Sequence, residues 1–220
     1  MPTFIEVLRT QWRWARAGLA PCAVVGFTIP ILAVQSFNNP AATGFQVGFL
    51  LSQSGQWSAA YPVLAAAVGL LVGFTAWSAD HRGRHVYALS LPLPRWQLVF
   101  HRFAAGLVLL AAVTAFLWTG AWIAGAAARI PPVLQAYPHA LTARFFLASL
   151  LAFAVFFAVS AGTARSAGLV LGAAAVLAIA QLLLRMFGTG TDLLGPFLDI
   201  LRTVPGPLAI FGGRWLLIDF

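Results

Sequence analysis

Residues 79–103 read ADHRGRHVYALSLPLPRWQLVFHRF, and they form the longest polar, charge-bearing interruption in an otherwise apolar chain. The stretch contains four of the thirteen arginines, three of the four histidines and one of the five acidic residues. Apolar runs that are each long enough to cross a bilayer flank it on both sides. A polar insert between two such runs must lie in water, so we predict that this stretch is a docking surface for another molecule.

The composition of the whole chain is that of a membrane protein. Its 220 residues are 61% hydrophobic and 8% charged, with a mean hydropathy of +0.89, whereas a soluble domain carries about 25% charged residues. The expected fold class is therefore an all-α polytopic membrane protein, with residues 1–220 forming a single transmembrane domain. The one cysteine, Cys22, excludes an internal disulfide and a cysteine-based metal cluster.

The net charge of +8 comes entirely from arginine, because the chain contains no lysine. The arginines lie at the ends of apolar runs, which is typical of residues that orient a chain in a membrane. We therefore predict a membrane-lipid environment and no nucleic-acid partner. The missing lysine and the abundant alanine indicate a GC-rich, bacterial genome, so the expected location is the bacterial inner membrane.

One interfacial helix and five membrane spans are predicted. Residues 3–16 are expected to form an amphipathic helix at the interface, because Phe4, Leu8 and Trp12 recur every four residues. A cleaved signal peptide is the competing interpretation, which the long basic leader and the lack of an A-x-A-like site disfavour. The segments long enough to cross the hydrocarbon core are 17–35, 58–78, 103–127, 142–161 and 167–187. Trp215–Phe220 turn apolar again at the end of the sequence.

The arginines also predict the orientation of these spans. With the N-terminus in the cytoplasm, the inner segments carry eight arginines and the outer segments carry five, as the positive-inside rule requires. The inner set is Arg9, Arg13, Arg16, Arg82, Arg84, Arg95, Arg102 and Arg165. The outer set is Arg129, Arg144, Arg185, Arg202 and Arg214. Residues 79–102 are thus predicted to be a cytoplasmic loop, and residues 188–214 an outer loop.

Residues 79–103 also contain a specific spacing of glycine, proline and arginine. Gly83 stands nine residues before Pro92, Leu89 and Ser90 lead into that proline, and Arg95 follows it. Arg102 opens the next apolar run, and the nearest acidic residue is Asp80. This pattern resembles the loop between the second and third spans in the membrane subunits of type-2 ATP-binding-cassette (ABC) exporters. Two positions depart from the family pattern, Arg84 in place of threonine and Val86 in place of a second acid.

The resemblance implies a permease that couples to a separate ATPase subunit. In that family the loop forms a short coupling helix that fits a groove on the ATPase, and two permease copies, identical or different, form the substrate pathway. The positions that the resemblance implies for coupling to the ATPase are Asp80, Gly83, Arg84, Leu89, Ser90, Pro92, Arg95 and Arg102, of which Arg84 departs from the family pattern and Asp80 is slightly out of register. The family usually has six spans, whereas five are predicted here. The chemistry of the stretch agrees, because residues 80–91 contain no proline and a helix there must end before Pro92. A merely solvated loop remains the alternative.

The sequence indicates that this chain is not an enzyme. A P-loop is impossible without lysine, so ATP hydrolysis must take place on another polypeptide. His81 and His85 are four residues apart and could share a helix face, but polar surface residues explain them as well, and we predict no metal and no cofactor. The rival function is that of a non-transporting accessory subunit in a larger membrane complex, respiratory or photosynthetic.

Two glycine pairs lie inside predicted spans at the spacing that lets helices approach closely in lipid. They are Gly69 with Gly73 and Gly168 with Gly172. Each pair is predicted to pack either against another helix of the same subunit or against a second copy.

Overall fold

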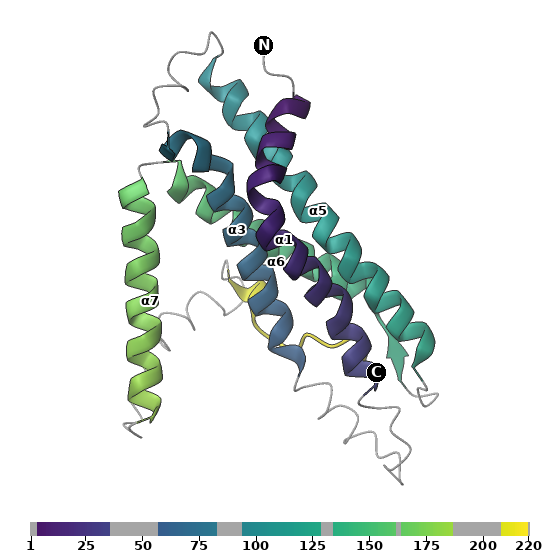
Figure 1. The fold of residues 1–220 in the computed structure, drawn as a ribbon. Coiled ribbons are helices and arrows are strands. Elements are labelled where there is room, and N and C mark those ends of the chain that lie inside the picture. Colours follow the sequence, from purple (N-terminus) through teal and green to yellow (C-terminus); the bar gives the residue numbers. More distant parts are fainter. Residues whose placement is uncertain are drawn as a thin grey trace. The chain divides into compact units, whose positions relative to one another are not determined.

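A computed structural model describes residues 4–35, 57–82, 94–128, 134–161, 164–186 and 208–219. These parts are mostly helical, as the composition predicts (Figure 1). The α-helices are α1 (Phe4–Gln35), α3 (Ala60–Arg82), α5 (Arg95–Ala127), α6 (Pro138–Ser160) and α7 (Ala164–Met186). The short elements are β1 (Gln135–Ala136), the 3-10 helix η1 (Ala209–Phe211) and β2 (Ile218–Asp219). Within the described residues, α1, α3, α5 and α6 are long and apolar enough to cross a membrane.

Helices α1, α3 and α5 pack with alternating direction. Gly18 of α1 faces Leu71 of α3, and Gly26 faces Leu64, so these two helices are antiparallel. Helix α5 runs parallel to α1, because the N-terminal Phe4 lies against the ring of His101 while Gly120 of α5 approaches Phe27 farther along. Figure 1 shows α1 and α5 side by side along most of their length.

Helix α6 completes the bundle by packing on both α3 and α5. Its antiparallel contact with α5 runs from Phe103 against Phe157, with ring centroids 5.5 Å apart, to Trp118, whose indole Nε1 donates to Nδ1 of His139 at 3.2 Å. Its parallel contact with α3 is made through Gly69, which faces Ser149, Ala152 and Phe153. Gly73 follows one turn later on the same face. The first glycine pair is therefore an intrachain packing site.

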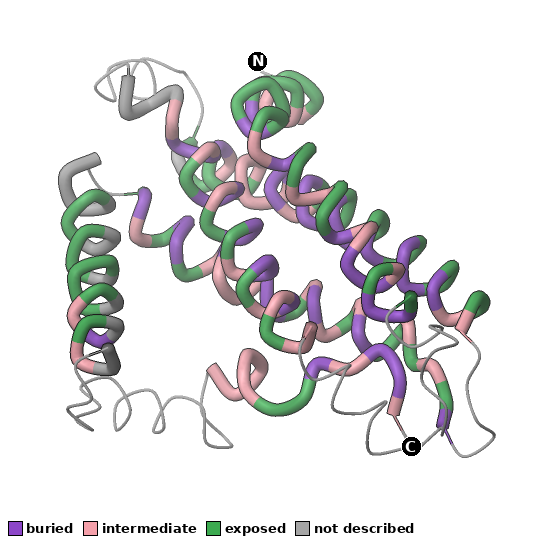
Figure 2. The backbone as a smooth tube through the Cα atoms, turned by 60° about the horizontal axis from the view of Figure 1, so that its bottom comes forward, coloured by how far each residue is buried: buried purple, intermediate pink, exposed green. Residues whose placement is uncertain are grey.

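Figure 2 shows buried and exposed positions alternating along each helix of this bundle. Many of the exposed residues are large and apolar. Leu19, Val68, Leu110, Leu117 and Phe153 are fully or almost fully buried. Val63 and Phe100 are more than 60% exposed, at 68% and 63%. In water so much exposed apolar surface would drive association, whereas in lipid it is the expected exterior.

The tryptophans mark the two ends of the bundle. Those at the end where α1 begins are Trp12, Trp14, Trp77 and Trp96, and those at the opposite end are Trp57, Trp118, Trp122 and Trp215. The 19 residues Ala60–Ser78, which lead from just after Trp57 to just past Trp77, rise about 28 Å, close to the ~30 Å hydrocarbon core. Tryptophan collects at membrane interfaces, so the two sets lie where the headgroups of a spanned membrane are expected.

The N-terminal part of the chain differs from the prediction. Residues 3–16 and 17–35 were expected to be separate, an interfacial helix and a span, but residues 4–35 form the single 32-residue helix α1. No helix-breaking residue occurs before Pro21, and Pro21 and Pro30 are both accommodated inside the helix, as they often are in membrane helices. At about 48 Å, α1 is longer than the hydrocarbon core, so its first turns project beyond the headgroup level.

The central polar stretch is shorter than predicted. Helix α3 continues to Arg82 and α5 begins at Arg95, whereas residues 79–102 were expected to be a loop. Pro94 is the N-cap of α5 with extended backbone angles, φ −60° and ψ 132°, and no proline interrupts the chain from there to Ala127. The first two turns of α5 thus belong to the stretch that was expected to be a loop, and they contact the start of α1 through His101 and Arg102.

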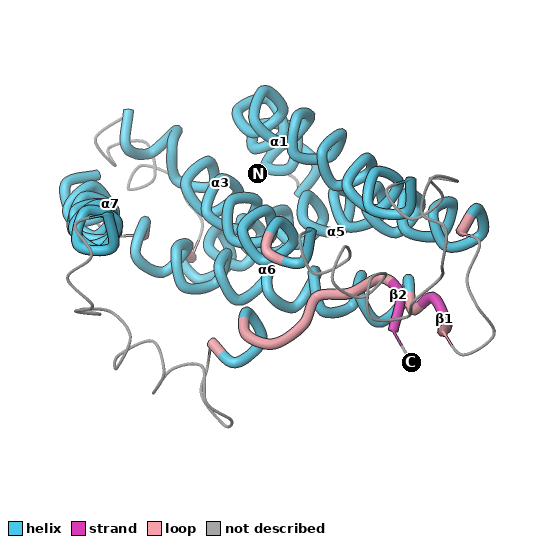
Figure 3. Tube along the Cα trace, turned by 90° about the horizontal axis from the view of Figure 1, so that it is seen from below, coloured by secondary structure: helices cyan, strands magenta, loops and turns pink. Residues whose placement is uncertain are grey.

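The apolar C-terminal residues are not helical where they are described. Residues 214–217 form neither helix nor strand and lead into β2, which pairs antiparallel with β1 in the register Ala136 with Ile218 (Figure 3). The amide of Tyr137 donates to the carbonyl of Leu217 at 2.8 Å. The segment 214–219 therefore packs on the end of the bundle at which α6 begins, and its apolar character comes from that packing.

Helix α7 and η1 belong to a second compact unit, residues 158–213. The fifth predicted span, residues 167–187, falls on α7, which begins three residues earlier. Gly168 and Gly172 lie on this helix, where a Cβ atom would meet nothing within 4 Å in the described chain. Most of the predicted outer loop, residues 188–207, lies outside the described residues.

Candidate functional site

The residues predicted to couple to a partner flank or lie within the segment between α3 and α5. Asp80 is in the last turn of α3, and Arg95 is the first residue of α5. Arg102 is two turns into α5 and half-buried. The other predicted positions lie outside the described residues: Gly83, Arg84, Leu89, Ser90 and Pro92.

Trp77 joins the end of α3 to its neighbours. Its ring lies 5.2 Å from that of Phe157 on α6, and the guanidinium of Arg102 stacks over it at 4.8 Å. Its indole Nε1 donates to the carbonyl of Phe157 at 3.1 Å, in a buried position. That carbonyl belongs to the last turn of α6, where no further turn of the helix supplies a partner, so Trp77 also caps α6.

A second contact brings α1 to the same place. Gln11 is buried, and its side-chain Nε2 donates to the backbone carbonyl of Arg102 at 3.2 Å. We call the set Gln11, Trp77, Arg102 and Phe157 the junction. It ties α1, α3, α5 and α6 together near the end of α3 and the start of α5.

Sequence reasoning named Arg102 but missed the other three junction residues. Gln11 and Phe157 give no local signal, because their role depends on helices that are far apart in sequence. Trp77 does give a local signal in the sequence. It lies just before the polar stretch, Arg102 lies at the end of that stretch, and a Trp–Arg pair in such positions favours stacking.

The junction can be tested by removing the indole N–H donor of Trp77. Trp77→Phe keeps an aromatic ring but removes the N–H, leaving the Phe157 carbonyl without this donor. We expect a loss of about 1–2 kcal/mol in the free energy of unfolding, measured by thermal or denaturant unfolding in detergent. Trp96→Phe is the matched control, because Trp96 is 68% exposed, and it should change stability by less than ~0.5 kcal/mol. Equal effects of the two changes would argue against the junction.

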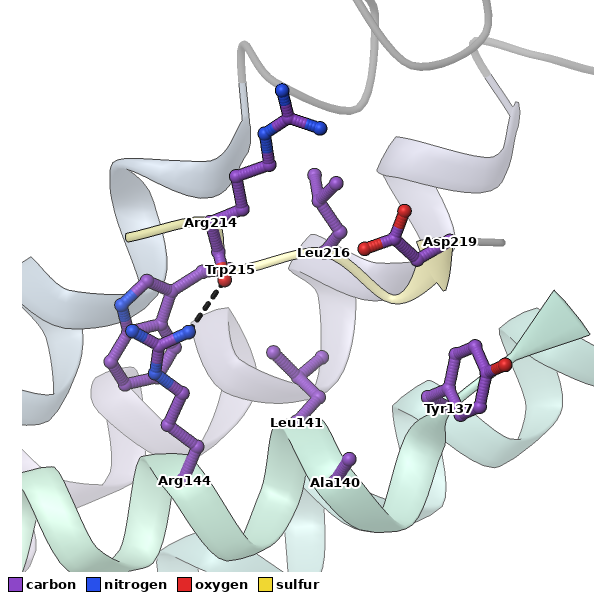
Figure 4. A pocket seen from close by; sticks show the side chains of 8 residues that line it. All are labelled: Tyr137, Ala140, Leu141, Arg144, Arg214, Trp215, Leu216 and Asp219. Carbon is purple, nitrogen blue, oxygen red and sulfur yellow. Dashed lines mark hydrogen bonds between the residues drawn. The ribbon is translucent and has the colours of Figure 1, made fainter. Parts of the chain in front are cut away.

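A pocket of about 300 Å³ lies at the opposite end of the bundle, between α6 and the segment 214–219 (Figure 4). From the α6 side it is lined by Tyr137, Ala140, Leu141 and Arg144, and from the segment by Arg214, Trp215, Leu216 and Asp219. The guanidinium of Arg144 stacks on the indole of Trp215 at 4.6 Å. Its Nη1 donates to the carbonyl of Arg214 at 2.5 Å.

These contacts offset the free-energy cost of placing an arginine near the membrane interior. Arg144 is half-buried and gives its charge to an aromatic face and a backbone carbonyl. Figure 4 shows the side chain of Arg214 extending away from Arg144, with Asp219 and Tyr137 on the far side of the pocket. The pocket has the size and polarity for a small polar molecule. Arg144, however, already holds the segment 214–219 in place by stacking on Trp215 and donating to the carbonyl of Arg214.

No group of three or more histidine, cysteine, aspartate or glutamate side chains lies together in the parts of the chain that are described. His81 and Asp80 lie at the end of α3, and His85 is outside those parts.

Comparisons with protein-family models, with curated proteins and with solved structures find no match to the chain. The architecture defines its class as a helical protein with four described helices able to cross a membrane.

Proposed function

We propose that this chain is the permease subunit of an ABC-type exporter, which docks on a separate ATPase through the segment between α3 and α5. The observation that carries the proposal is the junction, in which Arg102 of α5 stacks on Trp77 of α3 at 4.8 Å. This contact links α3 and α5 within two turns of the helix ends that flank the segment. The spacing of Gly83, Pro92 and Arg95 within the segment supports the same role.

The junction gives the segment a mechanical connection to the whole bundle. A push on residues 83–94 would act on Trp77 and Arg102, and through Phe157 and Gln11 it would reach α6 and α1. Packed helices move as rigid elements and not as deformable rods. Closure of two ATP-bound partner subunits would in this way shift the helices between inward- and outward-facing arrangements.

Two copies of the chain would form the pathway, with α7 as a fifth span. The four-residue spacing of Gly168 and Gly172 on α7 supports their use in contact between the copies. The location proposed is the bacterial inner membrane.

Loss of coupling is the direct test of this function. Arg95→Ala removes a guanidinium that can pair with a carboxylate on the ATPase, and Gly83→Val blocks close backbone approach. Each should lower the amount of ATPase that copurifies by about tenfold or more, while the permease itself remains folded and inserted. Arg129→Ala, in the predicted outer set, is the control.

Full retention of partner and of substrate-stimulated ATP hydrolysis in Arg95→Ala and Gly83→Val would reduce the segment to a solvated loop. Mass spectrometry of the proteins that copurify with the unaltered chain supplies the second readout. A P-loop ATPase supports the exporter, whereas respiratory or photosynthetic subunits would support the accessory role.

The orientation is tested separately by labelling in intact cells. In a Cys22→Ala background, His85→Cys should be protected from an impermeant thiol reagent, because the segment between α3 and α5 is proposed to be cytoplasmic. Asn39→Cys, in the connection after α1, should be labelled. The reverse pattern would place the N-terminus outside and remove the segment from any cytoplasmic ATPase.

A further inference from the structure

An apolar groove of about 220 Å³ runs along the line where α1 and α5 pack side by side. Its α1 wall extends from Trp12 to Val24, and its α5 wall extends from Leu109 to Phe116. Every residue that lines it is apolar. Along α1 the groove covers about 18 Å, slightly more than one leaflet of a ~30 Å hydrocarbon core.

The groove begins at a headgroup level. Trp12, at one end of it, follows Gln11, whose side chain bonds to Arg102 in the junction. From there the groove runs toward the middle of the bundle, where Phe116 lies one turn before Gly120, the residue that approaches Phe27. It thus occupies the depth of the leaflet on the N-terminal side of α1.

Three arginines of α1 lie at the Trp12 end of the groove, Arg9 before Trp12 and Arg13 and Arg16 after it. Successive residues are about 100° apart around an α-helix, so Arg9, Arg13 and Arg16 fall within the same sector of α1 as the groove-lining residues. All three side chains are exposed. Arginine near a headgroup level extends its charged end toward the interface while its stem stays on apolar surface. A cationic strip therefore adjoins the mouth of an apolar groove.

We propose that this groove binds an acyl chain of an anionic phospholipid from the same leaflet, with its phosphate held between Arg13 and Arg16. The apolar walls match a hydrocarbon chain, and guanidinium groups bind phosphate oxygens through paired N–H donors. Binding of this lipid requires neither a particular orientation of the chain in the membrane nor transport activity.

Charge disfavours a second copy of the chain as the occupant. Two copies related by a two-fold axis along the membrane normal would place the same surface of each against the other. Arg9, Arg13 and Arg16 of one copy would then face the same arginines of its partner. An anionic headgroup satisfies these charges, whereas a second copy repels them.

A photo-reactive diazirine residue in place of Ala112, which lines the groove, identifies the occupant. The chain is reconstituted in vesicles of phosphatidylglycerol and phosphatidylethanolamine, extracted into detergent, illuminated and analysed by mass spectrometry. The expected adduct is phosphatidylglycerol, enriched over its share of the vesicle lipid. The same residue in place of Ala111, which is exposed but does not line the groove, should give little lipid adduct after extraction.

Changing the cationic strip tests the headgroup. Arg16→Gln should lower the phosphatidylglycerol adduct at position 112 about fivefold, the effect of one basic side chain near anionic lipid. Arg214→Gln, at the opposite end of the bundle, should leave it unchanged. An adduct to a peptide, whether from α7 or from a second copy, would overturn the proposal. So would labelling of the two phospholipids in proportion to their abundance.

Discussion

Replacing Gly69 with leucine should prevent α3 from packing on α6 and abolish the assembled bundle. A Cβ atom at Gly69 would lie 2.5 Å from the carbonyl oxygen of Ser149, 2.7 Å from Cβ of Ala152 and 2.8 Å from the amide nitrogen of Phe153. Two of these atoms belong to the α6 backbone, which cannot swing aside as a side chain can. Any side chain at Gly69 therefore forces the two helices apart.

Even alanine at this position should destabilise the bundle. An alanine inside a helix ordinarily gains about 1 kcal/mol over glycine, but overpacking of a tight contact costs about 1–3 kcal/mol. We expect Gly69→Ala to lower the thermal unfolding temperature in detergent, and Gly69→Leu to leave no monodisperse protein on size-exclusion chromatography.

Gly26 of α1 provides a matched control on another helix. A Cβ there would lie 3.6 Å from a side-chain carbon of Leu64, an ordinary van der Waals distance, so Gly26→Ala should leave the stability of the chain unchanged or raise it. If Gly69→Leu unfolded at the temperature of the unaltered protein, the close approach of α3 to α6 would be wrong.

The helices of the bundle could be predicted because each carries its own evidence. About twenty consecutive apolar residues must form a helix in lipid, where the backbone has no other way to satisfy its hydrogen bonds. The predicted spans 58–78, 103–127 and 142–161 accordingly fall within or close to α3, α5 and α6. The pair Gly69 and Gly73 was predictable for the same reason, since its spacing lies within one helix.

The helix ends were less predictable, because apolar composition fades before a helix does. Polar residues 95–102 were assigned to a loop, yet Pro94 permits a helix to begin directly after it. The boundary at Ala17 was likewise drawn where arginines stop, although nothing in the backbone ends α1 there. Hydropathy predicts which residues lie within the membrane, whereas only capping residues predict where a helix ends.

Contacts between distant segments could not be predicted at all. The stacking of Arg144 on Trp215 joins residues 71 positions apart, and β1 and β2 are two residues each. Neither partner has a periodic pattern, so the sequence shows only an arginine within a span and a tryptophan near its own C-terminus. The cost of leaving a charge in the membrane was the one available indication that Arg144 has a partner.

The two ends of the bundle therefore differ in what they hold. At one end the junction fixes the helix ends around a polar segment, and at the other Arg144 fixes the segment 214–219 against α6. A change at the first end should alter partner docking without releasing the C-terminal segment. A change at the second end should release that segment.

Trp215→Ala should detach the segment 214–219 from α6. Trp215 is 2% exposed, and its truncation removes both the buried ring and the face on which Arg144 stacks. A buried tryptophan replaced by alanine costs about 3–5 kcal/mol, which would raise the released fraction by roughly two to three and a half decades. Leu217→Cys in a Cys22→Ala background reports this release, because Leu217 is 4% exposed and its thiol should react slowly until the segment detaches.

Trp215→Phe separates packing from hydrogen bonding in the same assay. The buried indole Nε1 of Trp215 has no hydrogen-bond partner in the described chain, so removing it leaves no acceptor unsatisfied. Because an aromatic ring remains for Arg144 to stack on, Trp215→Phe should label at Leu217→Cys far more slowly than Trp215→Ala. Trp122→Ala, at the same end of the bundle but 56% exposed, should leave labelling slow. If Trp215→Ala also labelled slowly, the Trp215 ring would not be what holds the segment, and the β1–β2 pairing with the hydrogen bond from Arg144 to the Arg214 carbonyl would suffice.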